Sequence, residues 1–234
     1  MSSTSDIAKE ILLSDSLDVE LPLLILCDEQ TSGRGQPGRV WQSNRESLTF
    51  TWCVSVESIP TANQCLLPLI AGVSICEAIE SPGIVAAKLK WSNDSLIQCK
   101  KVCGILVEKI PSGDQSWFLI GIGINVNQSK LDFEKLDESK FTFPPGSLKA
   151  HCGHEFDLQT VLLTTVKRLV ENTKKENQWT EHFRDRFDFL GERITFTKAN
   201  GEEVQGIFSG VDSTGSLQLE IDGVVQSFLS GRFL

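Results

Sequence analysis

Residues 33–41 read Gly33-Arg34-Gly35-Gln36-Pro37-Gly38-Arg39-Val40-Trp41, and an apolar, strand-like run at Leu21–Cys27 precedes them. Glycine lets the backbone approach a ligand closely and leaves N–H groups free to point at it. Arginine contributes a permanent positive charge and forked donors that suit phosphate or carboxylate. The stretch therefore predicts an anion-binding loop.

Three further polar or glycine-containing stretches follow in order. They are Lys90-Trp91-Ser92-Asn93-Asp94, then Lys100–Glu108, then Gly121–Asn127. Alone, the first is an ordinary polar turn, because Asn and Asp are turn formers. Gly121 and Gly123 lie within a predicted strand, where glycine costs stability unless something must lie close to the backbone. The order and spacing of the four stretches together favour a binding site.

Composition limits the class of protein. A chain of 234 residues holds one good-sized domain, or one domain with a small appendage. No apolar run approaches the roughly 20 residues of a membrane helix, and no secretory signal opens the sequence. The seven scattered cysteines indicate reduced thiols instead of a disulfide framework. We therefore expect a cytoplasmic protein that does not associate with membranes.

The charge balance argues against nucleic acid as a partner. The net charge is −9, whereas nucleic-acid binding rests on clustered Lys and Arg that neutralise phosphates. No helix-turn-helix pattern precedes the glycine-rich loop, so we expect neither DNA binding nor a repressor role.

Hydrophobic periodicity predicts a mixed α and β chain with a change of texture after Leu190-Gly191. A short N-terminal helix is capped by Thr4 or Ser5, and a longer helix is capped by Asp157. The predicted strands are a buried one at Leu21–Cys27, a half-buried one at Leu48–Val56, an alternating one at Val85–Trp91, and a pair at Gly104–Ile110 and Trp117–Val126. The predicted helices after the first are Thr61–Glu80, Leu158–Thr173 and Gln178–Phe189, with an irregular segment at Gln128–His151.

The last part of the chain predicts a small all-β appendage. Its predicted strands are Ile194–Thr197, Val204–Val211, Ser216–Ile221 and Val224–Phe228. Turn signals separate them, as in Asp222-Gly223. Short strands at this spacing are typical of a barrel.

Other chemistries fit the sequence less well. Gly33, Gly35 and Gly38 satisfy G-x-G-x-x-G, but a strand pattern follows where a dinucleotide fold needs a helix. Val85-Ala86-Ala87-Lys88 resembles a kinase lysine segment, but the H-R-D and D-F-G segments are missing. Cys99, Cys103, His151, Cys152 and His154 lack the tight pair spacing of a zinc site. With three histidines, none near the charged loops, a Ser-His-Asp triad is not expected.

The four stretches together resemble those of biotin protein ligases, in the monofunctional form without a DNA-binding domain. Residues 33–41 resemble that family's G-R-G-R-x-G-R-x-W loop, and residues 90–94 resemble K-W-P-N-D. Residues 100–108 resemble R-K-[LV]-x-G-I-L-V-E, and residues 121–127 resemble G-I-G-I-N-V-N. The resemblance implies an α+β fold: a mixed-sheet biotin/lipoate ligase-like catalytic domain at residues 1–189 and an SH3-like β-barrel at residues 190–234.

The resemblance also assigns roles to residues. It implies catalytic roles for Arg34, Asp94 and Lys101. It implies a biotin site of Ser3, Thr4, Ser5, Gln30, Arg34, Gly35, Gln36, Lys101 and Gly104, with residues 3–5 standing where the family has S-T-N. It implies a nucleotide site of Arg34, Gln36, Arg39, Trp41, Lys90, Asn93 and Asn125.

The implied reaction joins two anions. Biotin and ATP would give biotinyl-5′-AMP, and a lysine of a biotin carboxyl carrier protein, from acetyl-CoA carboxylase or a related carboxylase, would then displace AMP. Positioned Arg, Lys and backbone N–H groups relieve the charge repulsion, with Mg²⁺ arriving on ATP and no protein ligand assigned to it. The glycine-rich loop is expected to close as a lid over the water-sensitive anhydride. The resemblance also implies a possible homodimer formed through the sheet.

The sequence departs from the family pattern at several positions. Gln36 replaces the loop's second arginine, which predicts weaker retention of the adenylate. Ser5 replaces asparagine, Ser92 replaces proline, and Pro37 stiffens the loop. Asn44–Ser47 stands in place of a Pro/Gly-rich turn, and segments are missing before Ser3 and after Leu234. Two alternatives therefore stay open: a lipoate or octanoate ligase or transferase of related fold, and a non-catalytic biotin-binding homologue.

Overall fold

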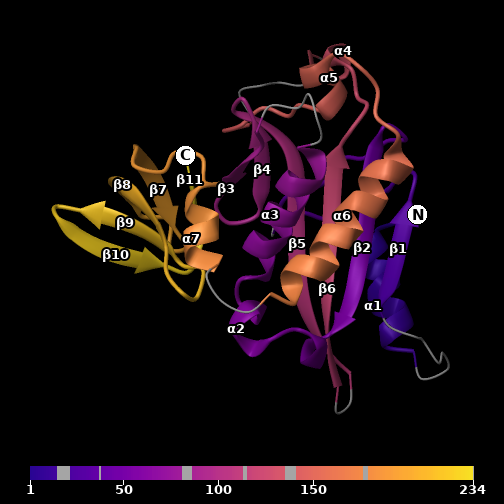
Figure 1. The fold of residues 1–234 in the computed structure, drawn as a ribbon, viewed down its shortest axis with the longest axis horizontal. Coiled ribbons are helices and arrows are strands. Elements are labelled where there is room, and N and C mark those ends of the chain that lie inside the picture. The colour runs from indigo at the N-terminus through magenta and orange to yellow at the C-terminus, as the bar shows by residue number, and fades with distance from the viewer. Residues whose placement is uncertain are drawn as a thin grey trace.

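The computed structural model describes residues 1–14, 22–36, 38–80, 86–112, 115–134, 141–175 and 179–233. They form two β-sheets with helices packed on the larger one (Figure 1). The α+β class predicted from the sequence is confirmed. Five positions named above, Leu21, Pro37, Val85, Gln178 and Leu234, lie outside the described residues.

The larger sheet has six strands in the order β1-β2-β6-β5-β4-β3. Its strands are β1 (Leu23–Cys27), β2 (Ser47–Ser55), β3 (Lys88–Lys90), β4 (Asp94–Ile97), β5 (Lys100–Ser112) and β6 (Gln115–Asn125). The predicted pairing of β5 with β6 is confirmed. All ladders between these strands are antiparallel. Parallel pairing in the described part of the chain is limited to isolated bridges, Leu89 with Phe187 and Lys101 with Pro145.

Strands β1 and β2 differ from their predicted burial. Strand β1 is an edge strand and is only half-buried, with Leu24 and Leu26 exposed, so its prediction as a buried strand was wrong. Strand β2 is buried on both faces, so its prediction as half-buried was also wrong. Helix α1 (Thr4–Leu12) causes the difference, because it covers the face of β2 that carries Cys53.

The opposite face of β2 packs on the main helices. Helices α3 (Leu67–Ile79) and α6 (Leu158–Thr173) cross this face of the sheet (Figure 1). The predicted helix at 61–80 is two helices, α2 (Thr61–Gln64) and α3, because Pro68 lacks an N–H and sits in the first turn of α3. The predicted cap of α6 is confirmed, since Thr160 N donates to Asp157 Oδ2 at 2.9 Å. The cap of α1 is Ser3 and not Thr4 or Ser5, and its side chain makes no capping bond.

The segment predicted to be irregular contains two short helices. They are α4 (Lys130–Glu134) and α5 (Leu148–Cys152), and Ser147 caps the second by accepting from Ala150 N at 2.9 Å. Five residues are too few to give a periodic hydrophobic signal. A single 3₁₀ turn, η1 (Val56–Ser58), follows β2.

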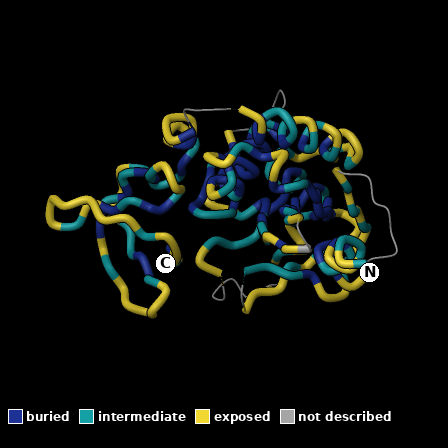
Figure 2. Tube along the Cα trace, turned by 90° about the horizontal axis from the view of Figure 1, so that it is seen from below, coloured by how far each residue is buried: buried dark blue, intermediate teal, exposed yellow. Residues whose placement is uncertain are grey.

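The smaller sheet has five strands in the order β10-β9-β8-β7-β11. They are β7 (Arg193–Lys198), β8 (Glu203–Val211), β9 (Leu217–Ile221), β10 (Val224–Phe228) and β11 (Gly231–Phe233). The sheet is consistent with an SH3-like domain but is not a closed barrel, because its edge strands β10 and β11 are not paired with each other among the described residues. Strand β11 was not predicted, and β10 is exposed along most of its length (Figure 2).

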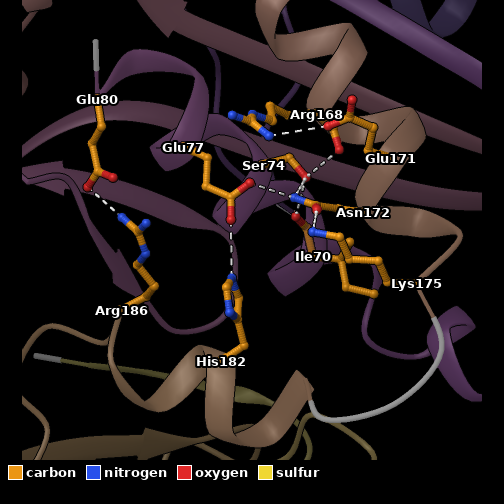
Figure 3. Close-up of polar contacts among 10 residues, drawn as sticks. All are labelled: Ile70, Ser74, Glu77, Glu80, Arg168, Glu171, Asn172, Lys175, His182 and Arg186. Carbon is orange, nitrogen blue, oxygen red and sulfur yellow. Dashed lines mark hydrogen bonds and ion pairs between the residues drawn. The ribbon is translucent and has the colours of Figure 1, made fainter. Parts of the chain in front are cut away.

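Polar contacts hold the segment before the smaller sheet against α3. Helix α7 spans Trp179–Arg184, which is shorter than predicted. Glu77 accepts from Asn172 Nδ2 at 3.0 Å and lies 3.2 Å from His182 Nε2 (Figure 3). Arg186 pairs with Glu80 just beyond the helix. These contacts fix where the chain leaves the helical layer and enters the smaller sheet.

Candidate active site

The centre of the larger sheet carries a row of small residues on one face. Thr49, Gly123, Gly104 and Asp94 lie opposite one another on β2, β6, β5 and β4. The indole ring of Trp41 lies on this row, because a Cβ atom on Gly123 would be 2.2 Å from Trp41 Cε2. The close approach predicted for the strand glycines is therefore confirmed.

A cluster of three charged side chains lies at one end of this row, with Lys90 and Asp94 buried and Lys101 partly buried. Lys101 Nζ lies 2.7 Å from Asp94 Oδ1, and Lys90 Nζ lies 3.5 Å from Asp94 Oδ2. The Lys90 ammonium also lies 5.0 Å from the centroid of the Phe143 ring and 5.8 Å from that of Phe233. Burial lowers the pKa of Lys90, against the opposing effect of Asp94. Two ammonium groups around one carboxylate leave a net positive charge that suits a polyanion.

The backbone of Lys101 is joined to a neighbouring loop. Lys101 N donates to Pro144 O at 2.9 Å, and Gly146 N donates to Lys101 O at 2.9 Å. Asn125, at the end of β6, donates through Nδ2 to Gly146 O at 2.9 Å. The loop at 144–146 is therefore held beside the charge cluster.

The turn between β3 and β4 is hydrogen-bonded to β5 and to the turn that precedes β9. It contains a cis peptide bond between Trp91 and Ser92. Asn93 Nδ2 donates to Ile105 O at 2.7 Å, and Ile105 N donates to Asn93 O at 2.9 Å. Trp91 Nε1 donates to Gly215 O of the smaller sheet at 2.9 Å. The smaller sheet therefore contacts the strand that carries Lys90.

The glycine-rich loop is anchored by its first arginine. Arg34 donates to both carboxylate oxygens of Glu108 at 3.0 and 2.7 Å, and its Nε lies 2.9 Å from Asp6 Oδ1. The hydrogen bonds to Glu108 raise the pKa of Arg34. Trp41 N donates to Gly33 O at 3.0 Å, which closes the loop on itself. Arg39 is exposed at the loop's outer edge.

A cluster of hydroxyl and amide groups lies where α1 begins. Ser3, Thr4 and Ser5 are buried. Thr4 donates to Gln30 Oε1 from its backbone N at 2.7 Å and from its hydroxyl at 3.2 Å. Thr51 of β2 bonds both the Thr4 and Ser5 hydroxyls. This cluster and the lysine cluster are the two polar regions on either side of the Trp41 ring.

The structure thus gathers most of the predicted site residues on one face of the sheet. Gly35 and Gln36 are half-buried within the loop, and Arg39 is exposed. The sequence did not single out four residues that contact the site: Asp6, Thr51, Phe143 and Phe233. Glu108 was quoted in a motif without a role. The signal available for Thr51 was its place in an alternating strand, which was read as solvent-facing.

Two comparisons with known families agree with this arrangement. Residues 1–125 match the biotin/lipoate A/B protein ligase family, and residues 189–234 match the biotin protein ligase C terminal domain. The first match covers more than half of the chain and includes both polar regions.

The chain belongs to the biotin/lipoate A/B protein ligase family.

Among relatives in this family, the bifunctional ligase/repressor BirA of Bacillus subtilis is 35% identical over 173 residues, which is 72% of this chain and 51% of that protein. The chain thus spans about half the length of the relatives that it matches first. The biotin–[acetyl-CoA-carboxylase] ligase of Mycobacterium tuberculosis is 26% identical over 206 residues, covering 86% of this chain and 74% of that one. The biotin protein ligase of Aquifex aeolicus, solved with biotin and ATP, is 30% identical with a TM-score of 0.80, covering 100% of this chain and 94% of that one.

Two further observations concern metal binding and membrane insertion by the described residues. No group of three or more His, Cys, Asp or Glu side chains among them is arranged to hold a metal ion. None of the helices in the same ranges is long and apolar enough to cross a lipid bilayer.

Proposed function

We propose that this protein is a biotin–[biotin carboxyl carrier protein] ligase. The observation that carries the proposal is the charge cluster of Lys90, Asp94 and Lys101 beside the Trp41-covered glycines, in a chain that belongs to the biotin/lipoate ligase family. It places concentrated positive charge next to an aromatic surface, which is what a reaction between a carboxylate and a nucleotide phosphate requires.

The first step is adenylation. An oxygen of the biotin carboxylate attacks the α-phosphorus of ATP, the bond to pyrophosphate breaks, and biotinyl-5′-AMP forms. Both reactants are anions, so the main barrier is charge repulsion. Lys101 and Lys90, fixed by one carboxylate of Asp94, supply the compensating charge without moving.

The second step is acyl transfer. A neutral lysine amine of the carrier attacks the carbonyl of the mixed anhydride, an amide bond forms, the nitrogen gives up a proton to water, and AMP leaves with the bonding electron pair. No side chain of the ligase itself acts as a nucleophile. The glycine-rich loop, anchored through Arg34 and Trp41, excludes water until the carrier lysine reacts with the anhydride.

The roles of individual residues are part of the proposal. The biotin site comprises Ser3, Thr4, Ser5, Gln30, Arg34, Gly35, Gln36, Lys101 and Gly104. The nucleotide site comprises Arg34, Gln36, Arg39, Trp41, Lys90, Asn93 and Asn125. Arg34, Asp94 and Lys101 are the catalytic groups. Support comes from the two polar regions on either side of the Trp41 ring.

Mg²⁺ fits this site as a companion of ATP. Both oxygens of Asp94 face lysine ammonium groups, and Asn125 Oδ1 accepts from Gln128 Nε2 at 3.3 Å. Mg²⁺ in nucleotide sites keeps several waters and needs only one or two protein carboxylates besides the phosphates. Because both Asp94 oxygens already pair with lysine ammonium groups, no protein ligand is assigned to the ion, which would neutralise phosphate charge when bound with ATP.

The proposal extends to the surroundings of the enzyme. The partner is a carrier protein or domain of acetyl-CoA carboxylase or a related carboxylase, in the cytoplasm, with neither DNA nor membrane involved. Residues 1–189 form the catalytic domain and residues 190–234 the appended one. A homodimer is the proposed assembly.

The deciding experiment measures pyrophosphate release from ATP by the purified protein, with biotin or with lipoate. Release with biotin alone is the expected result. Release with lipoate alone would replace the proposal with a lipoate ligase. If neither substrate gives pyrophosphate while biotin still binds, the protein is a binding homologue and the proposal is wrong.

A further inference from the structure

We infer that Thr51 is a positioning residue of the biotin site, whose hydroxyl sets the direction of a hydrogen-bond relay through Ser5, Thr4 and Gln30. The inference rests on the proposed function and deepens it. It states which groups of the site are donors and which are acceptors, and therefore which polar ligand edge the site selects.

The relay is buried and continuous. Thr51 is fully buried on β2, directly under the start of α1. Its hydroxyl lies 2.9 Å from Thr4 Oγ1 and 3.0 Å from Ser5 Oγ. Thr4 Oγ1 lies 3.2 Å from Gln30 Oε1. Four side chains from three segments thus form one chain of hydrogen bonds.

A glycine makes room for one end of the relay. Gly121 lies opposite Thr51 on the neighbouring strand. A Cβ atom on Gly121 would be 2.9 Å from Ser5 Oγ and 3.7 Å from Thr51 Oγ1. The Ser5 hydroxyl therefore reaches Thr51 only because position 121 has no side chain.

Counting protons gives the direction of the relay. The backbone N–H of Thr4 is always a donor, so the Gln30 atom that it contacts at 2.7 Å is the oxygen. That oxygen also receives the single hydroxyl proton of Thr4. Thr4 Oγ1 must then accept from Thr51, whose proton is in turn committed. Ser5 is left as the donor to Thr51, so the order is Ser5 to Thr51 to Thr4 to Gln30.

This direction fixes what the site offers to a ligand. Ser5 Oγ has spent its proton and keeps its lone pairs, so it acts only as an acceptor. Gln30 has its oxygen turned to α1, which leaves its two amide N–H groups as donors. The cyclic urea of biotin has two N–H donors and one carbonyl acceptor, which is the complementary set. Without the Thr51 hydroxyl, Ser5 would be free to turn its proton toward the N–H groups of the ligand, and Thr4 would lose the donor that fixes its hydroxyl.

The test compares Thr51→Val, which keeps the shape and removes the hydroxyl, with Thr51→Ser, which restores the hydroxyl. The matched control is Thr165→Val, because Thr165 is equally buried but donates to Val161 O within α6. The full chain is used throughout. Biotin affinity is measured by calorimetry, the KM values for biotin and ATP and kcat by pyrophosphate release, and octanoate affinity by competition.

We expect Thr51→Val to weaken biotin binding about tenfold, the effect of disordering one to two buried hydrogen bonds. The KM for biotin should rise by the same factor, whereas kcat and the KM for ATP should stay unchanged. Thr51→Ser and Thr165→Val should stay within about twofold of wild type. Octanoate lacks the urea ring, so its affinity should not change.

Three results would overturn the inference: wild-type affinity in Thr51→Val, equal loss in Thr51→Ser, or equal loss for octanoate. If Thr51→Val does not fold, Gln30→Glu tests the same polarity, since it keeps the acceptor for Thr4 and removes the donors. Retained biotin affinity in Gln30→Glu would then contradict the relay. A wild-type protein that neither binds biotin nor releases pyrophosphate would refute the proposed function itself, which is a different outcome.

Discussion

The indole ring of Trp41 lies on the backbone of Gly123, so closely that a Cβ atom there would be 2.4 Å from Trp41 Nε1 and 2.5 Å from Cζ2. The same ring lies 5.9 Å from Lys101 Nζ. The glycine-rich loop and the lysine cluster therefore meet through one aromatic side chain, and the glycine sets its height above the sheet.

Replacing Gly123 with alanine should displace this ring. We expect Gly123→Ala to lower the free energy of unfolding by about 1–3 kcal/mol, the usual cost of overpacking. In a Trp41→Ala background the same change should cost clearly less, because the clashing atoms are gone. Denaturant unfolding of the four proteins in this cycle measures the coupling. Equal costs in both backgrounds would show that the ring is not what Gly123 accommodates.

Removing the Lys101 ammonium should affect the chemistry and not the fold. We expect Lys101→Ala to reduce biotin-dependent pyrophosphate release by about 100- to 1000-fold, as for other charge-stabilising groups. Lys109→Ala is the control, because Lys109 lies on the same strand but is exposed and away from the cluster. Similar rates for the two variants would remove Lys101 from the mechanism.

The pH profile should report Lys90. Burial lowers its pKa below the ordinary 10.5, so the folded protein loses this charge at a lower pH than the unfolded chain does. Between the two pKa values the unfolded state binds more protons, so Lys90 makes the free energy of unfolding rise with pH there. Adenylation, which uses the charge, should instead fall in that window. In Lys90→Arg, the loss of adenylation rate at alkaline pH should move to higher pH. If it does not move, a group other than Lys90 causes that loss.

Restoring the loop's second arginine should tighten retention of the intermediate. Gln36→Arg adds a permanent charge and charge-assisted donors, so we expect about 10- to 100-fold slower release of biotinyl-5′-AMP. Dissociation of the preformed adenylate, followed by rapid mixing, measures this rate. Gln36→Met serves as the uncharged control. An unchanged rate in Gln36→Arg would mean that residue 36 does not face the phosphate.

The cysteines should differ in how fast a thiol reagent modifies them. Burial raises the pKa of Cys53 and of Cys76 to about 12, and also raises that of Cys103. At pH 8 a disulfide reagent should therefore modify the exposed Cys65 and Cys99 quickly and these three only on unfolding. Because the unfolded thiols ionise first, the free energy of unfolding should fall as pH rises from about 9 to about 12. Rapid native modification of Cys76 would contradict its burial.

Much of the site was predictable from short stretches of sequence. The lysine cluster comes from residues 90–94 and 100–108. The strand glycines predicted that another group lies close to the backbone, and the groups found there are the side chains of Trp41 and Ser5. The pairing of β5 with β6 followed from two apolar runs joined by a short connection. In these cases the signal is local, because the residues that determine the feature are near one another in sequence.

Other features depend on partners far away in the chain. Thr49 and Thr51 lie on the polar side of an alternating strand, and small polar residues do not reveal that α1 packs over Thr51 or that the Trp41 ring lies on Gly123, opposite Thr49. The contacts of Arg34 with Glu108 and of Lys90 with Phe233 join segments that carry no common pattern. Strand β11 is three residues long, which is too short for an alternating signal.

The hydrogen bonds around the site also determine at which stage of folding the site can form. Thr51 and Thr4 are 47 residues apart in sequence, Arg34 and Glu108 are 74 apart, and Trp91 and Gly215 are 124 apart. Closing such long loops costs chain entropy before any contact rewards it, and folding dominated by distant contacts is slow. The proposed site residues extend from Ser3 to Asn125, and Phe233 near the end of the chain contacts Lys90, so ligand-binding capacity should appear only late in folding, after these distant segments have met.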